Sequence, residues 1–281
     1  VAVSLGMASL GAILMYDTST IASAVKLMYS SMNSFTMVAV PLFFLAGILM
    51  DKGGVAEQIF SFCEDVVGWI HGGLGHVNIM TSILFAGMSG SSVADVASIG
   101  ALCANAMIRS GYPSPYAWGT TLASSMLASV IPPSILMVVA ASVAQVSMGQ
   151  ALFAGIIPGV FLGLVMMVYN YFYCKKHGIG HRIPFNGGRL WKSFKRALPA
   201  LMVPVILLGG MYTGYFTSTE AAAICVLYTL IVSMFVYKKL TFKDLPGIFM
   251  SVAKSTGTVL FVAITAKPAG QLFTLDGFPA L

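Results

Sequence analysis

Apolar residues form long unbroken runs along this chain instead of alternating with polar ones. No Asp, Glu, Lys or Arg occurs between Arg109 and Lys175, and none occurs from Leu27 to Met50. Apolar runs of about 17–24 residues have the length that an α-helix needs to cross about 30 Å of hydrocarbon. Membrane-spanning β-strands would instead show about ten residues of alternating polarity. The pattern predicts an all-α polytopic membrane protein and excludes a β-barrel.

Composition supports this fold class. Only 9% of the residues are charged and 58% are hydrophobic, whereas soluble domains carry about 25% charged residues. A soluble globular domain and a disordered chain are therefore excluded. The four cysteines are scattered singly, which excludes a disulfide-rich secreted module and a cysteine metal site. His177 and His181 are separated by two glycines, which disfavour a helix that would aim both side chains at one metal ion.

Basic residues are concentrated in one segment, residues 175–197, which contains seven of the 15 lysines and arginines. Such a concentration between apolar segments is typical of the cytoplasmic side of a membrane protein. The net charge of +6 therefore does not indicate nucleic-acid binding. The segment is predicted to be a basic cytoplasmic connecting loop. Its basic residues are Lys175, Lys176, Arg182, Arg189, Lys192, Lys195 and Arg196.

Anchoring this loop in the cytoplasm gives a path for the neighbouring segments. The predicted membrane helices are residues 36–50, 116–147, 151–173, 198–213 and 220–237. Ile131-Pro132-Pro133 is expected to break the second of these helices, and Pro158 to kink the third. Residues 55–70, in which acidic residues occur among apolar ones, are predicted to form an amphipathic arm helix at the membrane interface.

Residues 76–108 show a different pattern. Two apolar halves are separated by Ser89-Gly90-Ser91-Ser92, and each half is too short to cross the bilayer. Lys52 and Arg109, which flank this region, are both placed on the cytoplasmic side. The segment is therefore predicted to be a re-entrant helical hairpin that enters the bilayer, turns at mid-depth and leaves on the same side.

A weak internal repeat connects the two ends of the chain. Ala46-Gly47-x-Leu49-x4-Gly54 recurs as Ala269-Gly270-x-Leu272-x4-Gly277, 223 positions later. Lysines flank the second copy and Asp17 the first, which indicates opposite orientations, as in the inverted repeats of secondary transporters. Residues 1–174 are predicted to form a first repeat and residues 198–281 the start of a second. The chain is expected to be an excerpt, truncated at both ends.

The candidate site consists of two helix breaks at membrane depth, residues 89–92 and residues 130–133. Lipid cannot satisfy the backbone groups of a broken helix, so such breaks occur where protein or a water-filled site takes them up. Hydroxyl and carbonyl oxygens suit a small alkali cation such as Na⁺, and a half-helix N-terminus attracts an anionic substrate. Separately, the breaks could be a polar turn and a proline kink. Their occurrence together favours a paired ion and substrate site.

Three ionisable residues lie in or beside apolar segments. Asp95 is the only carboxylate between Asp65 and Glu220. It is either a cap or dipole partner of the second half-helix, or a group that tunes or ligates the bound cation or substrate. Glu220 is predicted to close a capping box with Thr217. The role of Lys267, in an otherwise apolar stretch, is open.

Two other functions fit parts of the sequence. Gly87-Met88-Ser89-Gly90 matches the GxSG motif of intramembrane rhomboid proteases. Such a serine needs a histidine base on another buried helix, and the four histidines lie near the predicted surface or in the basic loop: His71, His76, His177 and His181. A protease is therefore a minor alternative, and no enzyme activity is expected. An ion channel or exchanger of related architecture is the other alternative.

Several motifs resemble the large membrane subunit of tripartite ATP-independent periplasmic (TRAP) transporters, and together they cover almost the whole chain. The most specific is GMSGSSVADVASIG at residues 87–100. The others are PLFFLAG at 41–47, IPPSI at 131–135, AGIIPG at 154–159 and GYFTSTEAAA at 214–223.

This resemblance implies a Na⁺-driven importer of organic acids, such as C4-dicarboxylates or sialic acids, in the bacterial inner membrane. It implies an elevator movement, a small four-helix membrane subunit and a periplasmic solute-binding protein as partners, and no organic cofactor. The implied Na⁺ ligands are Ser89, Gly90, Ser91, Ser92, Val130, Ile131 and Pro132. The implied substrate-binding residues are Ser91, Ser92 and Asp95.

Overall fold

The computed structural model describes residues 2–16, 21–33, 35–144, 146–180 and 183–275. Within them all regular secondary structure is helical, which confirms the predicted all-α class. The elements are α1 (Ala2–Tyr16), α2 (Ile21–Met32), η1 (Phe35–Val38), α3 (Ala39–Lys52), α4 (Val55–Val67), α5 (Gly73–Ser89), α6 (Ser92–Asp95), η2 (Val96–Gly100), α7 (Ala101–Arg109), α8 (Ser114–Ser125), η3 (Met126–Ser129), α9 (Ile135–Ala144), α10 (Met148–Ala154), α11 (Ile156–His177), α12 (Gly187–Tyr212), α13 (Ser218–Ile231), η4 (Val232–Val236), η5 (Phe242–Asp244) and α14 (Leu245–Leu275).

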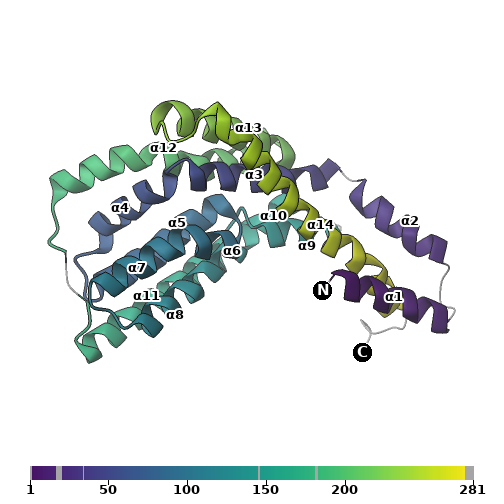
Figure 1. The fold of residues 1–281 in the computed structure, drawn as a ribbon, viewed down its shortest axis with the longest axis horizontal. Coiled ribbons are helices and arrows are strands. Elements are labelled where there is room, and N and C mark those ends of the chain that lie inside the picture. Colours follow the sequence, from purple (N-terminus) through teal and green to yellow (C-terminus); the bar gives the residue numbers. More distant parts are fainter. Residues whose placement is uncertain (1, 17–20, 34, 145, 181–182, 276–281) are drawn as a thin grey trace.

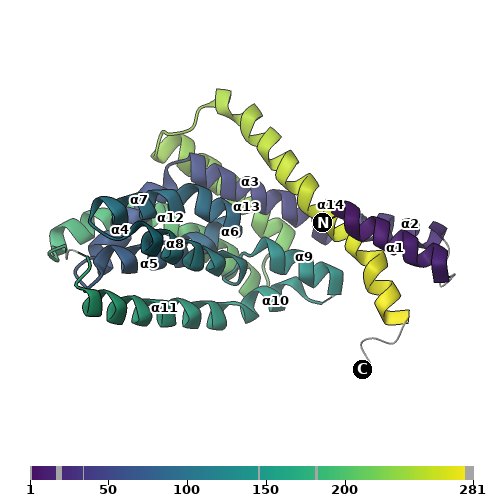
Figure 2. The ribbon, with the colours of Figure 1, turned by 60° about the horizontal axis from the view of Figure 1, so that its bottom comes forward.

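Helix α5 lies at the centre of the main bundle. It contacts α3 and α4 on one side and α7, α8 and α11 on the other (Figure 1). Its sequence suits this position because apolar and small residues occur on most of the helix surface and none of its residues is Asp, Glu, Lys or Arg. Helices α12 and α13 cover α3 and α4 from outside, and α11 runs along the opposite face of the bundle (Figure 2).

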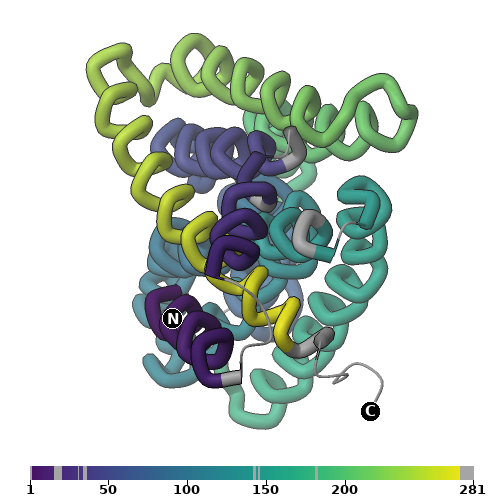
Figure 3. The backbone as a smooth tube through the Cα atoms, turned by 90° about the vertical axis from the view of Figure 1, so that its right-hand side faces the viewer, coloured from purple at the N-terminus to yellow at the C-terminus, as the bar shows by residue number. Residues whose placement is uncertain are grey.

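Helices α1 and α2 lie beside the bundle and pack on α14. Helix α14 contacts α3 and then continues past the bundle to α1 and α2, so that the first and last described helices meet at one side of the molecule (Figure 3). Residues 22–52, which lie 223 positions before α14, form α2, η1 and α3 instead of one continuous helix. The two segments related by the predicted repeat thus have similar lengths, but the first is divided into three helices and the second is one helix. Gly277, the last residue of the repeated motif, lies outside the described residues.

Four helical stretches within the described residues are long and apolar enough to cross a membrane, or up to five if a bent pair of helices is one span. They are Met148–His177, Gly187–Tyr212, Ser218–Val236 and Phe242–Leu272, and the bent pair is Ala39–Lys52 with Val55–Val67. The outer face of α11 exposes large apolar side chains, among them Phe161, Val168 and Phe172. Such surfaces fit contact with lipid acyl chains, and the chain has the helices of a polytopic membrane protein.

The prediction that residues 175–197 form a loop is wrong for residues 175–177 and 187–197, which are helical. Helix α11 continues to His177 and α12 already begins at Gly187. Lysine and arginine are good helix formers, so a concentration of positive charge does not end a helix. The start of α12 is instead fixed by Asn186, whose side-chain oxygen accepts hydrogen bonds from the backbone N–H groups of Gly188 and Arg189. The cytoplasmic position of the segment stays a prediction.

The helix that Pro158 was expected to kink is interrupted at Gly155, between α10 and α11. Pro158 has no N–H to donate to the carbonyl of residue 154, one turn before it, so the interruption lies where this proline weakens the helix.

Helix α4 forms the predicted arm and joins α3 at an angle of 68°. The bend is at residues 53–54, where Gly54 takes a left-handed conformation with φ of 77°. The arm packs on α12, and the buried carboxylate of Asp65 accepts a hydrogen bond from Nε of Arg189. This ion pair joins the arm to the basic start of α12, although the position of the arm at a membrane interface stays a prediction.

Candidate functional site

The first break separates α5 from α6. Helix α5 ends at Ser89, and Gly90 takes a left-handed conformation with φ of 61°. Glycine is the residue that adopts this conformation without steric cost. A Cβ atom at this position would also lie 2.1 Å from the carbonyl oxygen of Pro133. The glycine is therefore required both by the turn and by the close approach of the second break.

The chain restarts as a helix directly after this turn. Ser91 is the N-cap of α6, and its hydroxyl accepts a hydrogen bond of 3.4 Å from the N–H of Ala94. The short α6 continues through the π-helical η2 into α7, which packs back against α5. Residues 73–109 thus form two helical arms joined at residues 90–91, so the predicted interruption of the segment 76–108 is present.

The second break follows η3. Residues 130–134 are not helical, and their conformation is held by Ser134. The hydroxyl of this serine donates to the carbonyl oxygen of Ser129 over 2.7 Å and accepts from the N–H of Met137 over 3.2 Å. Two successive prolines, Pro132 and Pro133, lack the N–H groups that would continue the helix. The predicted break of residues 116–147 is therefore present, and α9 begins after it at Ile135.

The two breaks lie against each other. The N–H of Ile135 donates a hydrogen bond of 3.0 Å to the carbonyl oxygen of Gly90. The hydroxyls of Ser92 and Ser129 also form a hydrogen bond across the junction. Backbone and side-chain oxygens from two distant segments are thus brought together, as the sequence analysis expects of an ion site.

The predicted carbonyl oxygens differ in their surroundings. The Pro132 oxygen lies near Gly87, 3.6 Å from the position of a Cβ there, and the Pro133 oxygen touches Gly90. The carbonyl oxygen of Val130 instead lies against Gly155, at the break between α10 and α11. The backbone N–H of Ile131 continues the preceding turn by donating to Leu127. Pro133, which belongs to the predicted break but not to the implied Na⁺ ligands, thus lies closer to the hairpin turn than Val130 does.

Asp95 does not cap α6, because that position belongs to Ser91. Its side chain is 0% exposed and points into the bundle, beside the hydroxyls of Ser82 and Ser125. Neither carboxylate oxygen makes a hydrogen bond of good geometry with the part of the chain that the structure describes. In this conformation Asp95 is separated from the surface that carries Ser91, so direct contact of Asp95 with a substrate has no support here.

A buried polar cluster surrounds this carboxylate, and the sequence analysis missed it. Nδ2 of Asn78 donates to the hydroxyl of Thr121 over 2.7 Å, and the hydroxyls of Ser82 and Ser124 are 3.0 Å apart. The hydroxyl of Ser125 has no hydrogen-bond partner among the described residues. The spacing of Asn78 and Ser82 on one face of α5, in a stretch without charges, is the signal that could have revealed the cluster.

A small cavity of about 30 Å³ lies between α3 and the hairpin turn. Ser89 and Ser91 line it from the hairpin, and Asp51 lines it from α3. The close approach of the two elements depends on Gly47, where a Cβ would lie 3.1 Å from the carbonyl oxygen of Ser89. Asp51 is a second residue that the sequence analysis did not single out, because only the packing of α3 on the hairpin brings it to the site.

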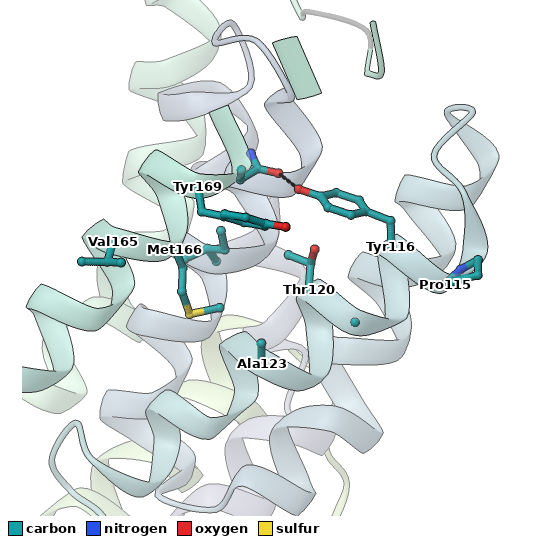
Figure 4. A pocket seen from close by; sticks show the side chains of 10 residues that line it. Pro115, Tyr116, Thr120, Ala123, Val165, Met166 and Tyr169 are labelled. Carbon is teal, nitrogen blue, oxygen red and sulfur yellow. Dashed lines mark hydrogen bonds between the residues drawn. The ribbon is translucent and has the colours of Figure 1, made fainter. Parts of the chain in front are cut away.

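A larger cavity of about 460 Å³ opens between α8 and α11 (Figure 4). Its described lining residues come from α5, α8 and α11, and not from the two breaks. Tyr116 donates to Oδ1 of Asn170 over 2.8 Å, and Nδ2 of Asn170 donates to the carbonyl oxygen of Gly72 over 3.1 Å. The ring of Tyr116 also stacks on that of Tyr173, with centroids 4.3 Å apart. These contacts fasten α11 to α8 and to the start of α5.

The geometry does not form a serine–histidine pair among the described residues. Ser89 is buried at the end of α5, whereas His76 lies near the start of this helix with Nε2 3.1 Å from the carbonyl oxygen of His71. His177 stacks on Tyr173 at the far end of α11. His181 lies outside the described residues.

The predicted capping box of α13 is confirmed. The N–H of Glu220 donates to the Thr217 hydroxyl, and the Glu220 carboxylate accepts from the Thr217 N–H over 2.8 Å. Glu220 therefore has a structural role at the start of this helix.

Comparison with known proteins identifies the family. The model of the DctM component of the tripartite ATP-independent periplasmic transporters matches residues 1–281. The chain is 36% identical over 278 residues to the sialic acid TRAP transporter large permease protein SiaM of Vibrio cholerae, covering 99% of this chain and 65% of the relative. It is 35% identical over 277 residues to the C4-dicarboxylate TRAP transporter large permease protein DctM of Pseudomonas aeruginosa, covering 98% of this chain and 65% of the relative.

A third relative is the sialic acid TRAP transporter permease protein SiaT of Haemophilus influenzae, which is 38% identical over 255 residues. Here the match covers 91% of this chain and 41% of the relative, so the chain spans less than two thirds of the length of these proteins. The relatives are permeases of transport systems and not enzymes. The chain belongs to the DctM component family of the TRAP transporters.

Proposed function

We propose that this chain forms part of the large permease subunit of a Na⁺-coupled importer of organic acids, with the coupling ion bound where the two helix breaks meet. The observation that carries the proposal is the junction itself, in which Gly90 and Ile135 share a backbone hydrogen bond and Ser92 faces Ser129. Buried breaks of this kind leave carbonyl and hydroxyl oxygens for an ion or a substrate.

The donor set at the junction fits Na⁺. The hydroxyls of Ser92 and Ser129 and the carbonyl oxygens of Pro132 and Pro133 are neutral, hard ligands. A neutral set suits an ion that must bind and leave in each cycle, because it holds a cation less tightly than carboxylates do. The buried carboxylate of Asp95, one turn along the hairpin, adds negative charge near this set without filling a ligand position.

The organic acid would bind beside Ser91 at the hairpin turn once α3 and the turn separate, because the cavity between them, about 30 Å³, has room for about one water molecule in this conformation. The N-terminus of the helix that begins at Ser92 points partial positive charge towards its cap, Ser91, which lines this cavity. The relatives carry sialic acid or C4-dicarboxylates according to their names, and a substrate of this carboxylate class is proposed here.

The partners proposed from the family are a small four-helix membrane subunit and a periplasmic solute-binding protein, in a bacterial inner membrane. Movement of the hairpin region against the rest of the protein, as in an elevator, is part of the same proposal.

The test is solute counterflow and uptake by the full-length complex in proteoliposomes, with and without an inward Na⁺ gradient. We expect uptake to require Na⁺ and the binding protein, and Ser91→Leu to abolish it. Ser61→Leu, on the exposed face of α4, is the matched control and keeps uptake near the wild-type rate. Uptake that ignores the Na⁺ gradient, or that survives Ser91→Leu, would refute the proposal. Transport that needs no binding protein would favour a channel or exchanger instead.

A further inference from the structure

A basic cavity of about 380 Å³ lies at the start of α14, away from the two helix breaks. Three lysines from two distant segments line it: Lys52 ends α3, and Lys239 and Lys243 precede α14. All three side chains are exposed. The other lining residues are Leu240, Asp244 and Gly247.

Three acidic groups lie near the cavity, and one of them, Glu57, pairs with a lysine of its lining. The carboxylate of Asp244 accepts a hydrogen bond of 2.9 Å from the N–H of Thr241 and so closes a capping box. Glu57 forms an ion pair with Lys239 over 3.5 Å, from the side of α4. Asp51 attracts Lys52 electrostatically, but it lines the separate cavity beside the hairpin turn. The lining itself carries three positive charges and one negative charge.

The cavity walls are positioned by the fold. The stem of Lys239 packs over Gly54, where a Cβ atom would lie 2.8 Å from Cγ of the lysine. Gly247 belongs to the first turn of α14, and a Cβ at this position would meet nothing within 4 Å. The backbone at the start of a 31-residue helix is therefore open to the cavity.

The surface next to the cavity is apolar. Phe242, Phe249 and Met250 are 69%, 54% and 58% exposed, and they lie on η5 and the first turns of α14. Phe242 also begins one of the stretches that can cross a membrane. One face of the start of α14 packs against α3 through Ile248 and Val252, and these exposed side chains lie on the rest of its surface. The basic cavity suits the anionic head group of a phospholipid, and the exposed phenylalanines at the end of the predicted span suit its acyl chains.

We propose that this cavity binds the phosphate group of an anionic phospholipid, with the acyl chains along Phe242 and Phe249. Lysine ammonium groups are point donors that recognise phosphate oxygens, and clusters of lysines at a membrane surface attract anionic head groups. A free phosphate has the same anionic chemistry but would gain nothing from the apolar surface. The inference does not depend on Na⁺ coupling or on the transported acid.

The experiment compares the purified full-length complex with a variant that carries Lys52→Gln, Lys239→Gln and Lys243→Gln. Both are placed in bicelles of phosphatidylcholine alone or with phosphatidylglycerol, and the melting temperature and the phospholipids retained after purification are measured. The control variant carries Lys192→Gln, Lys195→Gln and Lys254→Gln, which removes the same charge from lysines that do not line the cavity.

We expect phosphatidylglycerol to raise the melting temperature of the wild type and of the control by several degrees. The cavity variant should lose most of this rise and retain at least fivefold less phosphatidylglycerol, while its melting temperature in phosphatidylcholine stays unchanged. An equal rise in all three proteins would overturn the proposal. So would an equal rise with inorganic phosphate alone, because it would assign the cavity to a soluble anion. If the triple variant does not fold, Lys243→Gln alone is measured against Lys254→Gln with the same criteria.

Discussion

The backbone N–H of Ile135 donates a hydrogen bond of 3.0 Å to the carbonyl oxygen of Gly90. The donor begins the helix after the second break, and the acceptor forms the turn of the hairpin. One hydrogen bond thus satisfies a backbone group from each interrupted segment, in a region where unsatisfied groups are costly. The two breaks therefore form one structural unit, and a substitution in either should affect both.

Gly90→Ala is expected to destabilise this unit strongly. The left-handed conformation costs a residue with a Cβ about 1–2 kcal/mol, and the added carbon would also collide with the Pro133 carbonyl oxygen. Gly111→Ala is the matched control, because Gly111 has φ of 86° but open space around it. In thermal unfolding of the full-length complex in detergent, Gly90→Ala should lower the melting temperature more than Gly111→Ala and abolish uptake. Equal effects of the two variants would show that the contact with Pro133 contributes nothing.

Ser92 and Ser129 are expected to be energetically coupled. Each Ser→Ala variant should cost about 0.5–1.5 kcal/mol, because each removes the same hydrogen bond. The double variant should then cost little more than either single variant, which is the signature of interaction in a double-mutant cycle. The measurement is thermal unfolding with and without Na⁺, and stabilisation by Na⁺ should fall in all three variants. Additive effects, with stabilisation by Na⁺ unchanged, would place the ion elsewhere.

Asp95→Asn is expected to weaken the binding of Na⁺ without lowering the stability of the fold. The buried carboxylate has no hydrogen bond of good geometry among the described residues, so neutralising it removes a desolvation cost. The melting temperature without Na⁺ should stay equal or rise, while the Na⁺ concentration for half-maximal uptake should rise at least threefold. Glu57→Gln, on the exposed face of α4, serves as the control and should leave the Na⁺ dependence of uptake unchanged. A large loss of stability without Na⁺ would mean that the charge of Asp95 is a structural requirement.

Removing Asp65 and removing Arg189, the two partners of the ion pair between the arm and α12, should lower the stability of the protein by different amounts. The side chain of Asp65 is 4% exposed, whereas that of Arg189 is 48% exposed. Asp65→Asn leaves a cation that water can solvate and should cost at most about 1 kcal/mol. Arg189→Gln leaves a buried carboxylate without its cation and should cost about 3 kcal/mol. Melting temperatures of the two variants check this order, and small, equal effects would show that the pair is effectively solvated on both sides.

Much of the fold could be predicted because its causes are local in the sequence. Uncharged runs of helical length gave the all-α membrane class, and the glycine and serines at residues 89–92 placed the hairpin turn within one residue of Gly90. The two prolines likewise placed the second break. The capping box of Thr217 and Glu220 is equally local and was predicted from four residues.

The remaining features depend on which surfaces meet, and they were missed or misplaced. The direction of the Asp95 side chain follows from the π-helical segment after it and from the packing of α8 on α5. Asp51 reaches the site only because Gly47 lets α3 approach the hairpin. The helical start of α12 does not follow from the positive charge of this segment, because lysine and arginine favour helices and also occur in cytoplasmic loops.

The bridge from Tyr116 through Asn170 to the Gly72 carbonyl has a mechanical consequence. These hydrogen bonds connect α11 to the base of the hairpin. The proposed movement of the hairpin would therefore also move the apolar outer face of α11 through the surrounding acyl chains. In the proposed importer, drag from the membrane would then limit the rate of the hairpin movement. The fluidity of the bilayer would therefore be expected to set part of the turnover rate.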